Sequence, residues 1–492
     1  MKQSNHYILT FCLFLLFISK GMAQMIPKPF RHTGRPVSGP LSNSINDILI
    51  IGDDVWVGSY GVSHTTDNGN SWIGYTQADG LGKGSVSAIA ERDGVIWVAT
   101  GYDTLISNSG ELPAGGGLSY TLDQGENWYW IPQPIDSLDE NEYAPTTTHI
   151  QNLSYDIAIT DEAVWIASWG GGLRRSFDMG ESWEVVTVDG LPFDVSNNNF
   201  IHMAFAVMYN EYALWVGSAE GIHKSIDNGE TWTTFSHQNQ PDGISGNFVV
   251  AIAYQQFGDK DIVWAATIEA VDADEFRAVS KTEDGGLTWT ITLENEFAHN
   301  FGFDPVDGSV YVTTDNGLFK SNDFGETWAV FPQIVDSEKG EKVYTTEINS
   351  VAVGPDQTLW VGTNDGLAQS PDLGMTWKIH RAFQTPGEGK TPKTYAYPNP
   401  FSPLRDNLID GDGYVRFQYQ TKQDVRVTVR VYDFGMNLVK TVVDGKSRPA
   451  GDFAEVWDGR NTLGDMVANG VYFYKVSLSP GAALWGKVMV VN

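Results

Sequence analysis

Hydrophobic residues recur along this chain in short clusters of five, each ending in a small or hydroxyl-bearing residue. Six of these seven clusters carry Trp at the second position, and one carries Tyr there. Runs this short, rich in β-branched and aromatic residues, predict buried β-strands. The clusters are Val55–Ser59, Ile96–Thr100, Val164–Ser168, Leu214–Ser218, Val263–Thr267, Val310–Thr314 and Leu359–Thr363.

A polar octapeptide follows every cluster and has the form Ser/Thr-x-Asp-x-Gly-x-Ser/Thr-Trp, with Asn127 in place of the last hydroxyl-bearing residue in the second copy. Its Asp can accept hydrogen bonds from the N–H groups of a turn, and its Gly allows a positive φ. We therefore predict a hairpin turn in which the Asp has a structural role. The seven residues are Asp67, Asp123, Asp178, Asp227, Asp284, Asp323 and Asp372.

An alternating apolar run precedes the clusters, as in residues 86–90 and 348–353, so that each repeat holds about four short strand segments. The octapeptide tryptophans lie 39 to 57 residues apart. Four strands in a repeat of this length are typical of a propeller blade. We predict an all-β chain in which residues 24–383 form a seven-bladed β-propeller.

The pattern changes after the last repeat. Residues 384–395 contain Pro, Gly and Thr and predict a linker. Within residues 396–492, Val425–Tyr432 alternates apolar and polar residues as a half-buried strand does, and Lys487–Val491 reads as a last strand. These residues predict a second, small Ig-like β-sandwich.

Residues 1–23 read as a signal peptide, with Lys2, an apolar run from Ile8 to Ile18, and small residues at Gly21 and Ala23. The only cysteine, Cys12, lies inside the apolar run, so neither a disulfide framework nor a Cys-based zinc site is expected. No later segment is long and apolar enough for a membrane span. We expect a secreted or cell-surface protein.

Composition and charge restrict the class of partner. With 41% hydrophobic and 19% charged residues the chain is a folded one. The formal charge of −30 is concentrated in residues 24–395, where 51 acidic and 18 basic residues give −33, whereas residues 396–492 carry 10 acidic and 11 basic residues. This excess of acid argues against nucleic acid as a partner.

The octapeptide repeats resemble the Asp-box, or bacterial neuraminidase repeat, propellers. That family includes sialidases, xyloglucanases, sortilin-type receptors and photosystem assembly factors. The resemblance implies that the seven Asp residues lie on the hairpins between third and fourth strands, on the face opposite the ligand site.

Residues 396–492 resemble the Ig-like domain of the flagellar hook-capping protein and the C-terminal sorting domain of type IX secretion cargo. The segments that carry the resemblance are Tyr397–Phe401, Trp457–Asn461, Gly470–Tyr474 and Lys487–Val491. It implies export through outer-membrane secretion machinery. The alternative is a sandwich that serves only as a spacer.

Candidate ligand residues follow each cluster, because turns between second and third strands share one propeller face with the connections between blades. Aromatic rings beside carboxylates suit sugars. In Trp169–Arg175 an aromatic ring precedes a flexible Gly run; Trp169 either stacks on a ligand or packs on the next blade. The candidates are Tyr60, Tyr102, Trp169, Arg174, Glu220, Glu269, Asp315 and Asp365.

Catalytic signatures are weak. A sialidase needs an arginine triad, and the nearest match to its Arg-Ile-Pro motif is Trp130-Ile131-Pro132. Carboxylates are abundant, so a glycosidase pair is not identified. The nine His show no metal-ligand spacing. Calcium remains open, at Asp410–Gly413 or in an acidic loop at residues 136–142; no catalytic or metal residue is assigned.

The leading hypothesis is a secreted or cell-surface binding protein, whose propeller recognises a glycan or a protein and whose C-terminal domain directs export. The alternative is a carbohydrate-active enzyme of sialidase-like or endoglucanase-like type. A periplasmic assembly factor is a third class. Long inserts such as Gln333–Thr346 are expected to carry recognition.

Overall fold

The computed structural model describes residues 30–31, 34–106, 110–135, 148–190, 200–382, 392–409, 411–481 and 483–492. The predicted signal peptide lies outside these residues, as does most of the predicted linker.

Seven antiparallel sheets follow one another along residues 47–380, and the four main strands of each come from one continuous stretch of chain. The first three consist of β3 (Asp47–Ile51), β4 (Asp54–Ser59), β5 (Gly61–Thr65) and β6 (Trp72–Tyr75); β7 (Ser85–Arg92), β8 (Val95–Ile106), β9 (Gly110–Thr121) and β10 (Asn127–Ile131); and β11 (Ser154–Ile159), β12 (Val164–Ser168), β13 (Gly172–Ser176) and β14 (Glu184–Val186). Short strands β2 (Arg35–Val37) and β1 (Phe30–Arg31) add to the outer edges of the first and second sheets.

The remaining four sheets repeat the same order. They consist of β15 (Ala204–Tyr209), β16 (Leu214–Ser218), β17 (Gly221–Ser225) and β18 (Thr233–Phe235); β19 (Phe248–Phe257), β20 (Lys260–Ile268), β21 (Ala278–Thr282) and β22 (Thr290–Thr292); β23 (Ala298–Phe303), β24 (Val310–Thr314), β25 (Gly317–Ser321) and β26 (Ala329–Val330); and β29 (Ile348–Val353), β30 (Leu359–Thr363), β31 (Gly366–Ser370) and β32 (Lys378–His380). Between the sixth and seventh lies a two-stranded hairpin, β27 (Val335–Asp336) and β28 (Glu341–Lys342), and 3-10 turns occur at Gln77–Asp79 and Phe200–His202.

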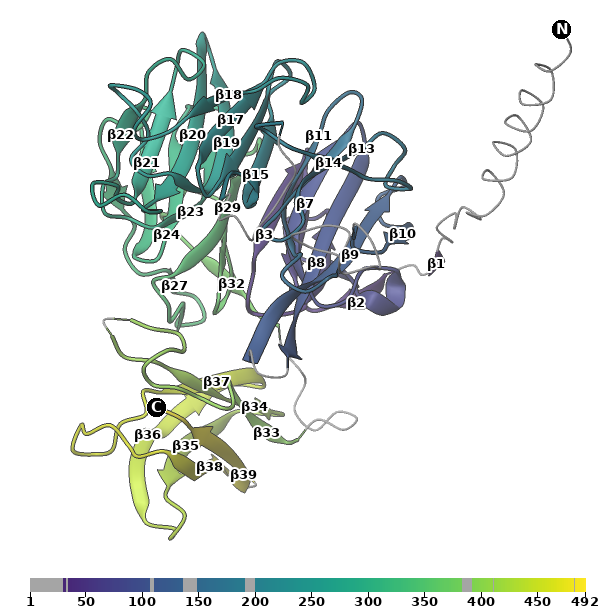
Figure 1. Ribbon diagram of the computed structural model, residues 1–492. Helices are drawn as coiled ribbons and strands as arrows, with labels where there is room; N and C mark the ends of the chain where they lie inside the picture. Colours follow the sequence, from purple (N-terminus) through teal and green to yellow (C-terminus); the bar gives the residue numbers. More distant parts are fainter. Residues whose placement is uncertain are drawn as a thin grey trace, which may run out of the picture.

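The sheets close into a ring, because the first strand of each contacts the first strand of the next, and β29 contacts β3. The chain is therefore all-β, with a seven-bladed β-propeller as predicted (Figure 1). Because strands alternate in direction, turns between second and third strands and the connections between blades share one face, which we call the mouth face. Hairpins between third and fourth strands lie on the opposite face, the box face.

Tryptophans hold neighbouring blades together. The cluster Trp residues and Tyr311 are at most 1% exposed. The octapeptide Trp128 packs edge-on against Trp56 of the preceding blade at 6.4 Å, and Trp72 packs on Trp360 at 6.1 Å across the junction of the last and first blades. Large aromatic side chains in such contacts dominate core energetics. The cluster aromatic residue of one repeat and the octapeptide Trp of the next thus pack together between neighbouring blades.

Each octapeptide forms the same hydrogen-bonded turn. One Asp227 oxygen accepts the backbone N–H of Thr231 at 2.9 Å and the other accepts its hydroxyl at 2.5 Å; these bonds lower the pKa of Asp227 to about 2. Equivalent bonds occur in all seven copies. Gly229 has a φ of 85°, and a Cβ there would lie 2.6 Å from Trp165 of the preceding blade. Only glycine fits this turn.

The C-terminal module, described from residue 392 to residue 492, is an Ig-like sandwich of two sheets. A three-stranded sheet holds β33 (Thr394–Tyr397), β34 (Val415–Thr421) and β37 (Gly451–Trp457). A four-stranded sheet holds β36 (Leu438–Arg448), β35 (Val425–Tyr432), β38 (Gly470–Ser479) and β39 (Ala483–Val490). The core contains Trp457, Tyr474 and the alternating valines of β35, as the sequence pattern predicts.

Candidate functional site

Every blade contributes a residue at or just before the start of its innermost strand to the lining of a central cavity of about 300 Å³ near the mouth face, and most blades add neighbouring residues. In six blades this residue is the extra residue of a β-bulge at the start of the innermost strand, and Asn46 precedes β3 at the equivalent position. Bulges re-aim a side chain out of the sheet. All seven are partly exposed, and we call them the mouth ring: Asn46, Ser87, Tyr155, Phe205, Val250, His299 and Asn349.

The mouth ring has an apolar side and a polar side. Tyr155 and Phe205 lie 5.4 Å apart between ring centres, and Phe205 lies 4.4 Å from Phe248. On the other side, His299 Nε2 lies 2.8 Å from Asp315 Oδ1. An opening with aromatic rings on one side and hydrogen-bonding groups on the other suits an amphipathic or hydroxyl-rich ligand.

Two carboxylates lie beside the mouth ring and join neighbouring blades. Asp47 accepts the N–H groups of Ile48 and of Ile89 in the next blade, both at 2.8 Å. Asp156 accepts the N–H groups of Ile157 at 2.8 Å and of Val207 in the next blade at 2.9 Å. Burial raises the pKa of Asp47 to about 6 and that of Asp156 to about 7, against the lowering effect of these bonds.

The raised pKa gives Asp156 a testable pH dependence. Its folded-state pKa exceeds its unfolded value, so the folded protein binds the proton more tightly and loses stability as pH rises toward and past 7. Relative to wild type, the Asp156→Asn variant should gain about 2–3 kcal/mol in free energy of unfolding between pH 5 and pH 8. Urea denaturation at both pH values measures this difference.

Comparison with the wild type cancels the titration of groups that do not interact with Asp156, such as the buried His223 and His380, whose pKa values burial lowers to about 3. Asp53→Asn, at an exposed hairpin position, is the control and should show no such pH-dependent difference. An equal response of the two variants would contradict the raised pKa.

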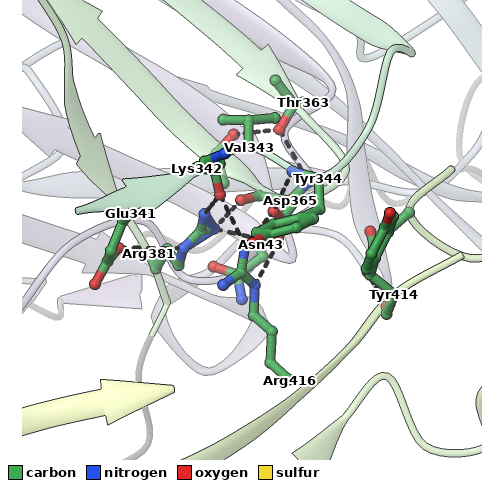
Figure 2. Close-up of polar contacts among 12 residues, drawn as sticks. Asn43, Glu341, Lys342, Val343, Tyr344, Thr363, Asp365, Arg381, Tyr414 and Arg416 are labelled. Carbon is green, nitrogen blue, oxygen red and sulfur yellow. Dashed lines mark hydrogen bonds and ion pairs between the residues drawn. The ribbon is translucent and has the colours of Figure 1, made fainter. Parts of the chain in front are cut away.

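The C-terminal module packs on the mouth face over the last blade (Figures 1 and 2). Arg416 of β34 donates to both oxygens of Asp365, from Nε at 2.8 Å and from Nη2 at 2.5 Å. Arg381, at the end of the last blade, lies 3.2 Å from the same carboxylate. Both arginines also donate to the Lys342 carbonyl in β28. We call Asp365, Arg381 and Arg416 the docking cluster.

The docking cluster is buried and its charges depend on one another. Asp365 is 0% exposed, and although burial opposes its charge, Arg381 and Arg416 hold its pKa below the ordinary value. Burial lowers the pKa of Arg381 to about 10. Tyr344 covers the cluster: its N–H donates to Asp365 at 2.8 Å and its ring lies 4.8 Å from that of Tyr414. A buried pair of this kind is costly to break on one side only.

A cleft of about 520 Å³ separates the two modules beside the docking cluster. The propeller wall comes from the mouth face, and the other wall from the last residue of β33 and the segment between β33 and β34. A backbone hydrogen bond from Thr346 to the Leu408 carbonyl joins the walls at 3.1 Å. We call this space the interdomain cleft; its lining is Ser44, Asp315, Thr345, Thr346, Glu347, Asn364, Tyr397, Pro398, Arg405, Asp406, Asn407 and Leu408.

The interdomain cleft and the mouth ring are neighbours. His299 of the ring pairs with Asp315 of the cleft, and Asn349 of the ring donates to Asn364 of the cleft at 3.0 Å. Ser44 donates to the same Asn364 oxygen at 2.9 Å. These two pairs therefore connect the lining of the mouth ring with the lining of the cleft.

The structure places six of the eight sequence-predicted ligand residues around the rim of the mouth face, one in each of the first six blades. Tyr60 is 64% exposed, Glu220 is exposed, and Trp169 is half-buried. Lys83 lies 3.3 Å above the ring of Tyr102, and Glu269 pairs with Arg277 at 2.6 Å. Asp315 is the one candidate that lines the interdomain cleft.

Two candidates are corrected. Asp365 is fully buried in the docking cluster, because the C-terminal module covers its hairpin. Arg174 is 2% exposed and donates to the Gly171 carbonyl at 2.9 Å, inside its own hairpin. Neither side chain is accessible to a ligand.

The mouth ring was missed by sequence reasoning. Its members differ in chemistry, and a β-bulge is set by strand register rather than by residue type. A positional signal exists, because the ring residue lies ten positions before the cluster Trp in each of the first four blades, as Tyr155 does before Trp165. Of the long inserts, Gln333–Thr346 contains the hairpin β27–β28, which contributes Lys342 to the docking contacts.

In the part of the chain that the structure describes, no group of three or more His, Cys, Asp or Glu could hold a metal ion, and no helix has the length and hydropathy to cross a bilayer. Asp410 and the acidic loop at residues 136–142 lie outside the described residues. Asp412 pairs with Arg460.

Comparisons with known proteins agree with this fold. A family model of FlgD Ig-like domains matches residues 405–481. No curated protein matches the chain. An ancestral GH74 enzyme has a similar solved structure, with a TM-score of 0.52 and 16% identity, and the match covers 91% of this chain and 63% of that one.

Two further solved structures match less well. The Niastella koreensis GH74 enzyme matches with a TM-score of 0.49 and 14% identity, over 94% of this chain and 74% of that one. PorZ of Porphyromonas gingivalis, described as a surface component of the type IX secretion system, matches with a TM-score of 0.44 and 17% identity, over 90% and 64%. This chain thus spans less than two thirds of PorZ and of the ancestral enzyme, and the likeness concerns the fold alone.

Proposed function

We propose that this protein is a secreted or cell-surface binding protein that recognises a glycan or a protein on the mouth face of its propeller. The observation that carries the proposal is the mouth ring, in which each of the seven blades contributes one side chain to a common opening, six of them from β-bulges. Loop and bulge positions on a rigid scaffold are where binding residues concentrate. No cofactor enters the proposal.

The proposal also covers the type of propeller and the route by which the protein is exported. The shared hydrogen-bond pattern of the seven octapeptides supports an Asp-box propeller. The apolar N-terminal run supports a signal peptide, and the likeness of residues 405–481 to FlgD Ig-like domains supports a type IX sorting role for the C-terminal module. Outer-membrane secretion machinery is then its partner.

Replacing Phe205 with Ala tests the binding role. The full mature chain is screened on a glycan array and against surface proteins of the producing cell, and the ligand found is titrated by calorimetry. Phe205→Ala should weaken binding at least tenfold, because it removes the aromatic contact between Tyr155 and Phe248.

The matched control is Phe177→Ala, since Phe177 is 51% exposed in a box-face hairpin of the third blade. It should bind like the wild type. Equal affinity of all three proteins would place the ligand elsewhere and refute the mouth ring as the recognition site.

Export is tested separately by ending the chain at Gln384. Loss of the truncated protein from the cell surface and medium, with accumulation in the periplasm, supports sorting. Unchanged secretion supports the spacer alternative. Retention of the full chain in the periplasm would favour an assembly factor.

The carbohydrate-active enzyme remains the second candidate, since Asp47 and Asp156 are two carboxylates of raised pKa lining the central cavity. Raised carboxylate pKa values are a feature of glycosidase acids. Against this role, each carboxylate already accepts two backbone N–H bonds. Hydrolysis of a glycan that Asp156→Asn abolishes would establish the enzyme.

A further inference from the structure

The interdomain cleft extends the recognition surface beyond the propeller. We propose that it is a binding subsite for a neutral oligosaccharide, and that the C-terminal module stays attached as its second wall. The inference rests on the proposed function: it names the ligand class and adds a module that a propeller alone would lack.

Both walls are fixed in place. The docking cluster, the Thr346–Leu408 backbone bond and the Tyr344–Tyr414 contact hold the module on the mouth face. The cleft therefore exists before a ligand arrives, and preorganised walls lower the entropic cost of binding. Removing the module would delete Tyr397 and Arg405 and uncover the buried Asp365.

The lining selects the ligand class. It presents hydroxyls of Ser44 and two threonines, amides of Asn364 and Asn407, and carboxylates, next to the ring of Tyr397. Sugar hydroxyls both donate and accept hydrogen bonds, so they match a lining of mixed polarity, and an aromatic ring can cover the apolar face of a sugar. Three carboxylates line the cleft against one arginine, and residues 24–395 carry a charge of −33, so phosphorylated or uronic-acid ligands are disfavoured.

Because the cleft and the mouth ring are neighbours, a ligand that occupies both would have several sugar units. The pairs His299–Asp315 and Asn349–Asn364 lie between the two spaces, and the aromatic side of the ring lies beyond them. A chain that fills the cleft can continue to Phe205. An oligosaccharide should therefore bind more tightly than its monosaccharide.

The test uses the full mature chain with neutral oligosaccharides of glucose, xylose and mannose, measured by calorimetry. Tyr397→Ala should weaken binding at least tenfold. Arg405→Ala, at an exposed cleft residue whose loss leaves the core intact, should weaken it severalfold. Tyr212→Ala, at a 77% exposed position on the box face, is the control and should bind like the wild type. Thermal unfolding confirms that each variant is folded.

A second arm introduces a protease site into the predicted linker, at residues 385–390. After cleavage, the module should co-purify with the propeller and oligosaccharide binding should persist. A module that dissociates while the propeller retains full affinity would overturn the inference.

Two other results would also overturn it. Weakening by Phe205→Ala without any effect of Tyr397→Ala and Arg405→Ala would leave the mouth ring as the site and the proposed function intact. If none of the neutral oligosaccharides binds while a protein ligand does, the sugar subsite is refuted and protein recognition stands.

Discussion

Replacing Arg416 with Ala should lower the free energy of unfolding of the docked protein by about 3–5 kcal/mol. The reason is that Asp365 is fully buried and takes two charged hydrogen bonds from Arg416. The alanine variant leaves Arg381 as the remaining cation in contact with that carboxylate among the described residues. Urea denaturation followed by tryptophan fluorescence measures the loss, and limited proteolysis detects release of the module.

The control is Arg430→Ala in the same module. Arg430 lies 3.7 Å from Asp444, with 44% and 72% of the two side chains exposed. Exposed pairs contribute about 0–1 kcal/mol, so this variant should unfold almost like the wild type. Similar losses for the two variants would show that the docking cluster contributes no more than a surface ion pair.

Replacing Trp165 with Ala should cost about 3–5 kcal/mol of stability. Trp165 is 0% exposed and packs in a cluster with Val207 and Val216 of the next blade, close to Gly229. Its removal leaves a cavity at a junction between blades, where the ring constrains relaxation. Thermal and urea unfolding of the full chain measure the effect.

Phe177→Ala provides the comparison, because the two aromatic residues share one contact and differ in burial. Arg175 lies over both rings, 5.7 Å from that of Trp165 and 5.0 Å from that of Phe177. Phe177 is 51% exposed, so its loss should cost less than about 1 kcal/mol. A small effect of Trp165→Ala would mean that contacts between blades do not depend on the cluster tryptophans.

The propeller was predictable because its signals are local and repeated. A buried strand such as Leu214–Ser218 and a turn built on Asp227 are each specified within a few residues, and their recurrence indicates a closed array. The same pattern predicts which turns form the rim of the mouth face, and Tyr60 and Glu220 in these turns are exposed.

The centre of the site and the docking cluster were not predictable in this way. Phe205 enters the central cavity because of a register shift between two strands, and nothing in its own residue type signals it. Asp365 has the turn position of an exposed ligand residue, but Arg416 lies 51 residues later in another module. Contacts between modules depend on how two finished folds fit together, and a single sequence carries no local mark of that fit.

The junction between the last and first blades has a consequence for the order of folding. None of the described blades combines strands from both ends of the propeller. The ring is closed instead by contacts between distant residues: Ser44 donates to Asn364, 320 residues away, and the Ala382 N–H donates to Asn43, 339 residues away. Closing so long a loop carries the highest entropic cost in the chain, so we expect the ring to close last. The Asn43 carbonyl accepts the N–H of Gly366, next to Asp365, and so the docking cluster assembles at this junction. We therefore expect the C-terminal module to dock only on a propeller whose ring has closed. In an incompletely folded chain the module should remain undocked.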